Sequence, residues 1–322
     1  MTVDVCNVLV TGATGFVGGA LVKRLAGEYP ARCVLAAVRR LDLALPENVR
    51  PVLVGDSLFA TDWRTVLHGV EAVVHCAARV HVMRDEAGDP LEVYRQINVQ
   101  GTLNLARQAA EAGVRRFVFV SSIKVNGEAT LPGCPFSTNE APAPEDAYGL
   151  SKAEAESGLQ QLAQQTGMEV VIIRPPLVYG PGVKGNFSSL LGWVARGLPL
   201  PLGAVTNNRR SLVGLDNLVD LILTCIDHPK AVNQTFLVSD GEDLSTTELL
   251  QRIGKVMNRS VHLIPVPVPV LHIASSLLGK RAIAERLLGS LQVDISKTCT
   301  LLNWTPPVSV DEGLRRAVQQ RL

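Results

Sequence analysis

The sequence has almost no excess of positive or negative charge. Its 31 Lys and Arg residues are matched by 30 Asp and Glu residues, so the formal net charge is only +1. Without a basic excess we expect no nucleic-acid partner. The six cysteines are scattered and lack C-x-x-C or zinc-ligand spacing, so we expect no metal site and no disulfide framework. Reduced thiols and the absence of a signal-peptide pattern predict a cytoplasmic protein.

Long hydrophobic runs are also scarce. One stretch, Leu263–Leu278, is strongly apolar, but Pro265, Pro267 and Pro269 interrupt it. A spanning helix needs about 20 apolar residues, so we expect no membrane span. The stretch is expected to form a strand and then a helix packed on the core, and contact of this helix with a membrane surface is the alternative.

Apolar runs alternate with helix-like segments through the first half of the chain. The runs are nearly continuous in apolar residues, which is typical of parallel strands covered on both faces. This alternation predicts an α/β fold, a doubly wound parallel Rossmann sheet. Strands are expected at residues 5–10, 33–38, 52–54, 72–75, 116–121 and 169–173, and helices at residues 16–27, 62–67, 91–112 and 148–166.

The sequence becomes irregular and rich in proline and glycine after Arg174. We therefore predict an NAD(P)-binding Rossmann domain over residues 1–174 and a mainly substrate-binding domain over residues 175–322. A strand near residues 235–240 is expected to return to the first sheet. Ser245 followed by Glu248 predicts a capping box at the start of a helix.

A glycine-rich turn lies between the first expected strand and the first expected helix. Glycines at this spacing let the chain turn sharply and let backbone N–H groups approach a phosphate at the helix N-terminus. We therefore predict a dinucleotide site, and a purely structural turn is the alternative. The predicted contact residues are Gly12, Thr14, Gly15, Phe16, Val17 and Gly18.

The second expected strand ends in Arg39 and Arg40. An acidic residue at this place binds the ribose of NAD, whereas arginine accommodates the 2′-phosphate of NADP. We therefore favour NADP(H). NAD(H) remains possible if both arginines are solvated surface charges and Asp42 binds the ribose.

Tyr148 and Lys152 are four residues apart and share one face of an expected helix. A nearby ammonium favours the phenolate form of a tyrosine, whose ordinary pKa is about 10. Tyr148 could therefore exchange a proton with a substrate alcohol or carbonyl. Ser122 follows an expected strand at its carboxyl end, where ligands of such sheets bind, and its hydroxyl could contact the same substrate oxygen.

The combination resembles the extended short-chain dehydrogenase/reductase superfamily, and within it the nucleotide-sugar epimerase/dehydratase/reductase group. Several motifs occur in the family's order over nearly the whole chain. They are Thr11–Gly18 (TGxxGxxG), Gly55 and Asp56 (a turn beside adenine), His75–Ala78 (HxAA), Asn98–Thr102 (NVxGT), Ser122 with Tyr148 and Lys152, and Arg174–Gly182 (RPxxVYGPG).

The resemblance implies roles for individual residues. Tyr148 would be the acid/base, Ser122 its partner on the sugar oxygen, and Lys152 a ligand of the nicotinamide ribose. Further cofactor contacts would be Asp56, Ser57, Ala77, Ala78, Asn98 and Pro175. The substrate contacts would be Val80, Ser122, Lys124, Tyr148, Asn186 and Arg210. Relatives commonly pair through two helices, so a homodimer through residues 91–112 and 148–166 is expected.

Two departures from the family pattern guide the choice of reaction. Ile123 and Lys124 stand where dehydratases of the group need acidic residues, which argues against dehydration. Epimerases of the group usually carry an acidic residue in place of the arginine pair that ends the second strand. The sequence looks most like the bacterial enzymes that reduce UDP-4-keto-6-deoxy-N-acetylglucosamine for surface polysaccharide. We therefore expect an NADPH-dependent 4-keto reductase of a UDP-sugar. The alternatives are an NAD-dependent UDP-sugar 4-epimerase, acting on UDP-glucose or UDP-N-acetylglucosamine, and a non-catalytic NADP(H) sensor.

Overall fold

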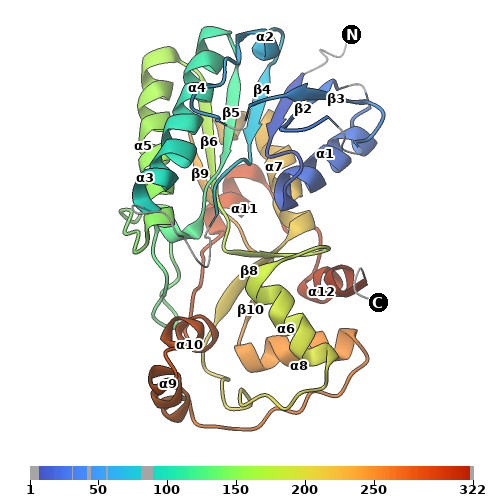
Figure 1. Ribbon diagram of the computed structural model, residues 1–322, viewed down its shortest axis with the longest axis vertical. Helices are drawn as coiled ribbons and strands as arrows, with labels where there is room; N and C mark the ends of the chain where they lie inside the picture. Colours follow the sequence, from blue (N-terminus) through green and yellow to red (C-terminus); the bar gives the residue numbers. More distant parts are fainter. Residues whose placement is uncertain (1–6, 31, 42–44, 56, 81–89, 320–322) are drawn as a thin grey trace.

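A seven-stranded parallel sheet forms the upper half of the molecule (Figure 1). The computed structural model describes residues 7–30, 32–41, 45–55, 57–80 and 90–319. The strand order is β3-β2-β1-β4-β5-β6-β9, and every neighbouring pair is parallel. The strands are β1 Val8–Thr11, β2 Val34–Val38, β3 Val49–Leu53, β4 Ala72–His75, β5 Arg116–Val120, β6 Glu169–Arg174 and β9 Thr235–Leu237.

Helices cover both faces of this sheet, and each face has its own apolar core. α1 (Phe16–Glu28) and α7 (Leu215–Asp227) pack on one face, and α4 (Gly101–Glu111) and α5 (Ala147–Thr166) pack on the other (Figure 1). The short α2 (Arg64–Leu67) lies beside α4. The prediction of a doubly wound Rossmann sheet is confirmed.

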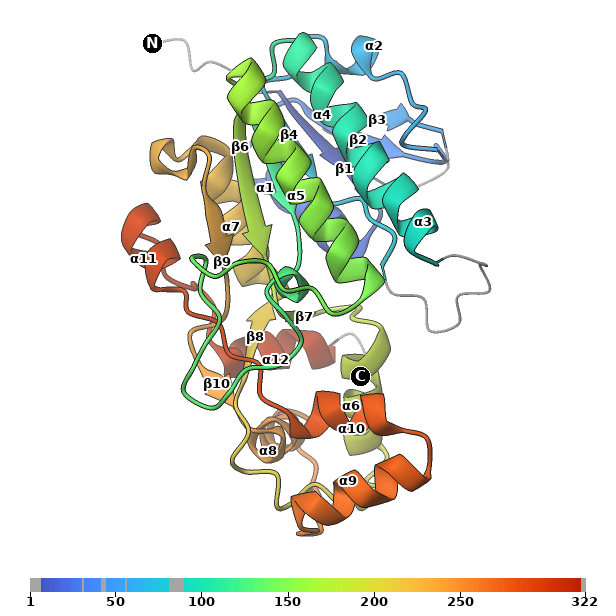
Figure 2. The same ribbon diagram turned by 90° about the vertical axis from the view of Figure 1, so that its left-hand side faces the viewer.

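A smaller part of the molecule lies beyond the carboxyl ends of the parallel strands (Figure 2). It contains a three-stranded sheet in the order β10-β8-β7 and a third apolar core. Its strands are β7 Leu177–Tyr179, β8 Arg210–Gly214 and β10 Asp243–Leu244. The remaining helices are α6 Gly185–Ala195, α8 Thr246–Val256, α9 Val268–Leu277, α10 Arg281–Leu288, α11 Ser296–Leu302 and α12 Val310–Gln319. The chain crosses between the two parts more than once, because α7 packs on the seven-stranded sheet and β9 is one of its strands. The domain limits 1–174 and 175–322 stay a prediction.

Local signals in the sequence predicted several elements well. The capping box is present, because Ser245 accepts from the Glu248 N–H and Glu248 accepts from the Ser245 N–H. The expected return strand is β9, which pairs with β6. The expected helix at 91–112 is interrupted, since α3 (Pro90–Tyr94) is followed by a π-helical turn, Arg95–Gln100, before α4 begins.

One structural expectation is confirmed only in part. The helix in the apolar stretch, α9, packs on the third core through Val268 and Leu271, but none of its residues is fully buried. The strand expected before it is reduced to a bridge between Leu200 and Leu263. Within the described ranges, no helix is long and apolar enough to cross a membrane.

Candidate active site

The glycine-rich turn joins β1 to the N-terminus of α1. Gly12 has a φ of +65°, and a Cβ at this position would lie 2.8 Å from the Ala77 nitrogen. A Cβ on Gly18 would collide with the Gly12 carbonyl oxygen. Gly15 caps α1 without a side-chain hydrogen bond, so the first N–H groups of the helix have no side-chain cap. Backbone N–H groups that are not covered by side chains, at the N-terminus of a helix, fit the pyrophosphate of a dinucleotide.

Ser122 and Tyr148 meet at the carboxyl end of β5. Ser122 follows the strand directly, and Tyr148 lies in the first turn of α5, whose N-cap Asp146 accepts from the Gly149 N–H at 2.6 Å. A side-chain hydrogen bond joins the hydroxyl groups of Ser122 and Tyr148. The structure therefore brings together two of the three residues expected to do the chemistry, at the sheet edge where ligands of this fold bind.

Lys152 is buried one turn further along α5. Its Nζ donates to the Val120 carbonyl at 2.9 Å and lies 4.4 Å from the centre of the Phe119 ring. Burial lowers the pKa of Lys152 to about 8. Its ammonium is therefore directed at the end of β5.

The expected lowering of the Tyr148 pKa by Lys152 is not found. Burial raises the pKa of the Tyr148 phenol, and the Asp146 carboxylate raises it further, while the hydrogen bond to Ser122 acts in the opposite direction. The physical reason is that desolvation disfavours the phenolate. In this state Tyr148 is a neutral hydroxyl.

A buried ion pair fixes the position of α5 against the sheet. The Arg174 guanidinium, at the end of β6, donates to both oxygens of Glu156, with contacts of 2.5, 3.0 and 3.2 Å. Ser121 donates to the same carboxylate at 2.5 Å. Arg174 also donates to the side-chain oxygen of Asn126 at 2.9 Å. Asn126 is therefore a buried partner of the arginine.

Lys124, which we expected to contact substrate, has two carboxylate partners. Its Nζ donates to Glu128 and to Asp146, each at 2.5 Å. Burial opposes the charge, but these hydrogen bonds outweigh it and raise the pKa of Lys124. Since Asp146 caps α5, Lys124 links the loop after β5 to the turn that carries Tyr148.

His75 and Asn98 bind neighbouring segments of the expected cofactor site. Thr102 donates to the Asn98 carbonyl, so its oxygen accepts from His75 Nε2 at 3.0 Å, and His75 Nδ1 accepts from the Thr11 hydroxyl at 2.7 Å. Burial lowers the pKa of His75 to about 3, so this ring is neutral. Asn98, in the π-helical turn, accepts from the Arg79 N–H at 2.9 Å. These bonds hold the chain that follows β4, including Ala77 and Ala78, beside the glycine turn.

The remaining expected contacts are spread over separate loops. Arg39 and Arg40 are exposed at the end of β2, and Val80 is exposed beyond β4. Asp56 lies outside the described residues, as does Asp42. Ser57 has a buried hydroxyl without a hydrogen-bond partner among the described residues. Pro175 accepts from the Ile123 N–H at 3.0 Å, which places it beside the Ser122 loop.

A second cluster of positive charge lies in the smaller part of the molecule. Arg210 begins β8 and donates to the Gly289 carbonyl at 3.1 Å. Burial lowers the pKa of Arg210, and the nearby Arg286 of α10 lowers it further. Within the part of the chain that the structure describes, neither arginine forms an ion pair. Asn186 is exposed in the first turn of α6.

Sequence reasoning missed Arg286. It is one of several basic residues in its stretch, and nothing in their spacing distinguishes it. Only folding shows that it approaches Arg210, and two partly buried guanidinium groups without carboxylate partners fit a diphosphate.

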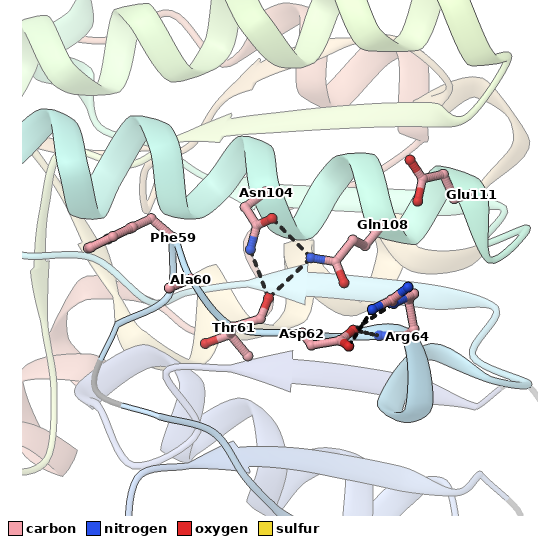
Figure 3. A pocket seen from close by; sticks show the side chains of 8 residues that line it. All are labelled: Phe59, Ala60, Thr61, Asp62, Arg64, Asn104, Gln108 and Glu111. Carbon is pink, nitrogen blue, oxygen red and sulfur yellow. Dashed lines mark hydrogen bonds and ion pairs between the residues drawn. The ribbon is translucent and has the colours of Figure 1, made fainter.

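Two surface hollows lie away from these groups. One, of about 320 Å³, opens between α4 and the loop before α2 (Figure 3). Its polar side chains bind one another, because Asn104 and Gln108 both donate to the Thr61 carbonyl and Arg64 pairs with Asp62. The other, of about 390 Å³, lies beside α5 and β9. Neither contains a predicted site residue.

Comparison with known proteins decides the family. A model described as the NAD dependent epimerase/dehydratase family matches residues 8–239. The chain belongs to this family. It is 52% identical over 316 residues to a UDP-glucose 4-epimerase of Vibrio cholerae, and the match covers 97% of this chain and 94% of that protein.

Two solved structures from Bacillus cereus share the fold. The UDP-N-acetylglucosamine 4-epimerase has a TM-score of 0.79 at 19% identity, covering 98% of this chain and 100% of that one. The UDP-glucuronic acid 4-epimerase in complex with NAD has a TM-score of 0.78 at 20% identity, covering 98% of each chain.

These findings correct the main functional prediction. The expectation of an NADPH-dependent 4-keto reductase is wrong, because the 52% identity to a UDP-glucose 4-epimerase agrees with the epimerase alternative. The preference for NADP(H) drawn from Arg39 and Arg40 also finds no support. Both side chains are exposed, so water can solvate their charges without a 2′-phosphate. The predicted enzyme class, an extended short-chain dehydrogenase/reductase acting on nucleotide sugars, is confirmed at the level of the family.

Proposed function

We propose that the protein is an NAD-dependent UDP-sugar 4-epimerase that interconverts UDP-glucose and UDP-galactose. The observation that carries the proposal is the 52% identity, over nearly its whole length, to a UDP-glucose 4-epimerase. The Ser122–Tyr148 pair at the carboxyl end of β5 supplies the chemistry that such a reaction needs.

Each residue of the site has a step in this proposal. Tyr148 takes the proton of the C4 hydroxyl as the C4 hydrogen leaves as hydride, and returns a proton to the same oxygen when hydride comes back to the other face. Ser122 holds that oxygen through its hydroxyl. NAD, when bound, would supply the acceptor and then the donor of the hydride, so the sugar would be oxidised and reduced again with no net consumption of cofactor.

Lys152 prepares Tyr148 for the first step. The ammonium is buried beside the end of β5, where it can bind the nicotinamide ribose and lie close to the phenol. A bound oxidised nicotinamide adds a positive charge, which would oppose the effect of burial on the Tyr148 pKa. We therefore propose that the phenol becomes a base only when the cofactor is in place.

In this proposal, backbone N–H groups bind the cofactor more than charged side chains do. The turn from Gly12 to Gly18 receives the pyrophosphate, and Ala77, Ala78, Asn98 and Pro175 line the nicotinamide side. Ser57, whose buried hydroxyl has no partner among the described residues, is assigned to the adenosine side. Arg39 and Arg40 are exposed at the end of β2 and are given no role in this proposal.

The substrate diphosphate is held in the smaller part of the molecule. We assign it to Arg210 and Arg286, with Asn186 at the start of α6, because these arginines are close together and lack carboxylate partners within the described residues. Val80 is assigned to the sugar side. Lys124 acts by holding Asp146 and the first turn of α5.

The test is turnover of UDP-galactose without added cofactor. We expect UDP-glucose to form although no cofactor is supplied, and denatured protein to release NAD. Tyr148→Phe should lower kcat by about 10²–10⁴-fold, the usual contribution of a general acid–base. Tyr94→Phe is the matched control, since its ring lies 6.1 Å from that of Tyr148, and it should lose less than about tenfold.

Three results would contradict the proposal. Release of NADP(H) by the denatured protein would support the NADP(H) preference that the sequence predicted. If the protein does not turn over UDP-galactose but does turn over UDP-N-acetylgalactosamine, its substrate is an N-acetylated UDP-sugar. Unchanged activity of Tyr148→Phe would support the non-catalytic sensor. The homodimer through residues 91–112 and 148–166 belongs to the same proposal, and light scattering on the purified protein tests it.

A further inference from the structure

α9 and the turn that follows it carry an unusual concentration of exposed apolar side chains. The exposed fractions are 63% for Ile273, 83% for Leu277 and 70% for Leu278. Val270 of α9 and Ile283 of the neighbouring α10 are also exposed. We call these five residues the α9 patch. Contiguous exposed apolar residues on one helix usually mark an interaction surface.

The patch is a face of the helix and not a frayed end. Val270, Ile273 and Leu277 recur at positions i, i+3 and i+7, so they form one stripe. The opposite face carries Val268 and Leu271, which pack on the third core. One face of α9 is therefore enough to hold the helix in place, and the other is left for a partner.

The charge beside the patch is mainly positive. The chain has no acidic residue between Glu248 and Glu285. Lys280 is exposed directly after Leu278 and Gly279 and forms no ion pair within the described residues, while Arg281 pairs with Glu285. An apolar stripe beside an unpaired cation fits a partner with an apolar interior and a negatively charged surface.

The patch also lies where a flat partner could reach it. Figures 1 and 2 both place α9 at the end of the molecule farthest from the seven-stranded sheet, with no element beyond it. α10, which carries Arg286, lies between α9 and the rest of the site. A surface that covers α9 would leave the glycine turn and α5 uncovered.

We propose that the α9 patch binds an anionic membrane surface. Ile273, Leu277 and Leu278 enter the boundary between headgroups and acyl chains, as the apolar face of an interfacial helix does. Lys280 meets anionic headgroups. A second copy of the chain fits less well, because a two-fold contact through the patch would bring the same positive charges together.

The test is flotation of the full-length protein with lipid vesicles. Wild type should float with vesicles of phosphatidylcholine and phosphatidylglycerol in a 7:3 ratio (an experimental setting of roughly physiological negative charge) and much less with phosphatidylcholine alone. Ile273→Ser/Leu277→Ser should weaken binding at least about tenfold. Lys280→Gln should weaken it about fivefold. Leu131→Ser is the matched control, since Leu131 is 74% exposed but lies outside the patch, and it should bind as wild type does.

Other outcomes overturn the proposal. If the wild-type protein stays at the bottom of the gradient with anionic vesicles, the patch does not bind a membrane. Equal binding by the serine double variant shows that the patch is not the contact. Self-association in light scattering, without vesicles and lost in the double variant, assigns the patch to a second copy. An unchanged melting temperature in each variant shows that a loss of binding is not a loss of folding, and none of these readouts depends on the proposed reaction.

Discussion

The ion pair between Glu156 and Arg174 offers a sharp test of how this site is held. The two side chains are 3% and 5% exposed, and three contacts join the guanidinium to the carboxylate. Glu156→Gln keeps the shape but leaves Arg174 as a buried charge without its counter-ion. Removing one partner of a buried pair usually destabilises a protein by about 3–5 kcal/mol.

This free energy translates into a measurable melting shift. At about 2.1 cal/mol/K per residue, a chain of 322 residues has an unfolding entropy of about 0.7 kcal/mol/K. Glu156→Gln should therefore lower the melting temperature by about 4–7 °C in calorimetry. Because the same carboxylate accepts from Ser121, the neighbour of Ser122, kcat should fall as well.

A surface pair supplies the control. Arg281 and Glu285 form an i,i+4 pair with side chains 79% and 55% exposed. Glu285→Gln should cost less than about 0.5 kcal/mol. Equal effects of the two substitutions would refute the reasoning from burial. The double variant Glu156→Leu/Arg174→Met, which removes both charges, should recover much of the lost stability but not the activity.

Three further predictions concern the cofactor turn, the buried histidine and the loop after β5. Gly18→Ala should abolish retention of NAD after purification, because its Cβ would collide with the Gly12 carbonyl, whereas Gly27→Ala, where no atom lies within 4 Å, should retain it. Burial lowers the pKa of His75 to about 3. Its unfolded form takes up a proton below about pH 6.5, so stability should fall by up to about 1.4 kcal/mol per pH unit as the pH falls from there toward 3. His75→Asn should remove this part of the acid sensitivity in urea unfolding, and a parallel loss in both proteins would contradict it. Lys124→Met should lower kcat about ten- to a hundredfold with little change in KM, because it releases Asp146 at the start of α5; an increase in KM alone would instead indicate substrate contact.

The Rossmann sheet could be predicted because its signals are local. Val34–Val38 and Ala72–His75 are apolar throughout, since both faces of these strands are covered. The glycine turn and the capping box at Ser245 likewise depend on residues that are neighbours along the chain. The reaction could not be predicted from the arginine pair after β2, because the solvation of an exposed charge depends on what lies around it.

The smaller part of the molecule was predicted poorly for a related reason. β8 and β10 are short strands whose pairing joins residues far apart in the sequence. The approach of Arg286 to Arg210 is of the same kind. The apolar stretch at 263–278 has the composition of a core helix, and only packing shows that one of its faces has no partner within the described structure.

By itself, the sequence determined the sheet, the turn that receives a dinucleotide and the chemical identity of Ser122, Tyr148 and Lys152. Only the tertiary structure decided how they act together. It buried Lys152 against the end of β5, raised the pKa of Tyr148 by desolvation and gave Lys124 two carboxylate partners. The physical reason is that hydrogen bonding and burial are properties of neighbours in space, and most of those neighbours are distant along the chain.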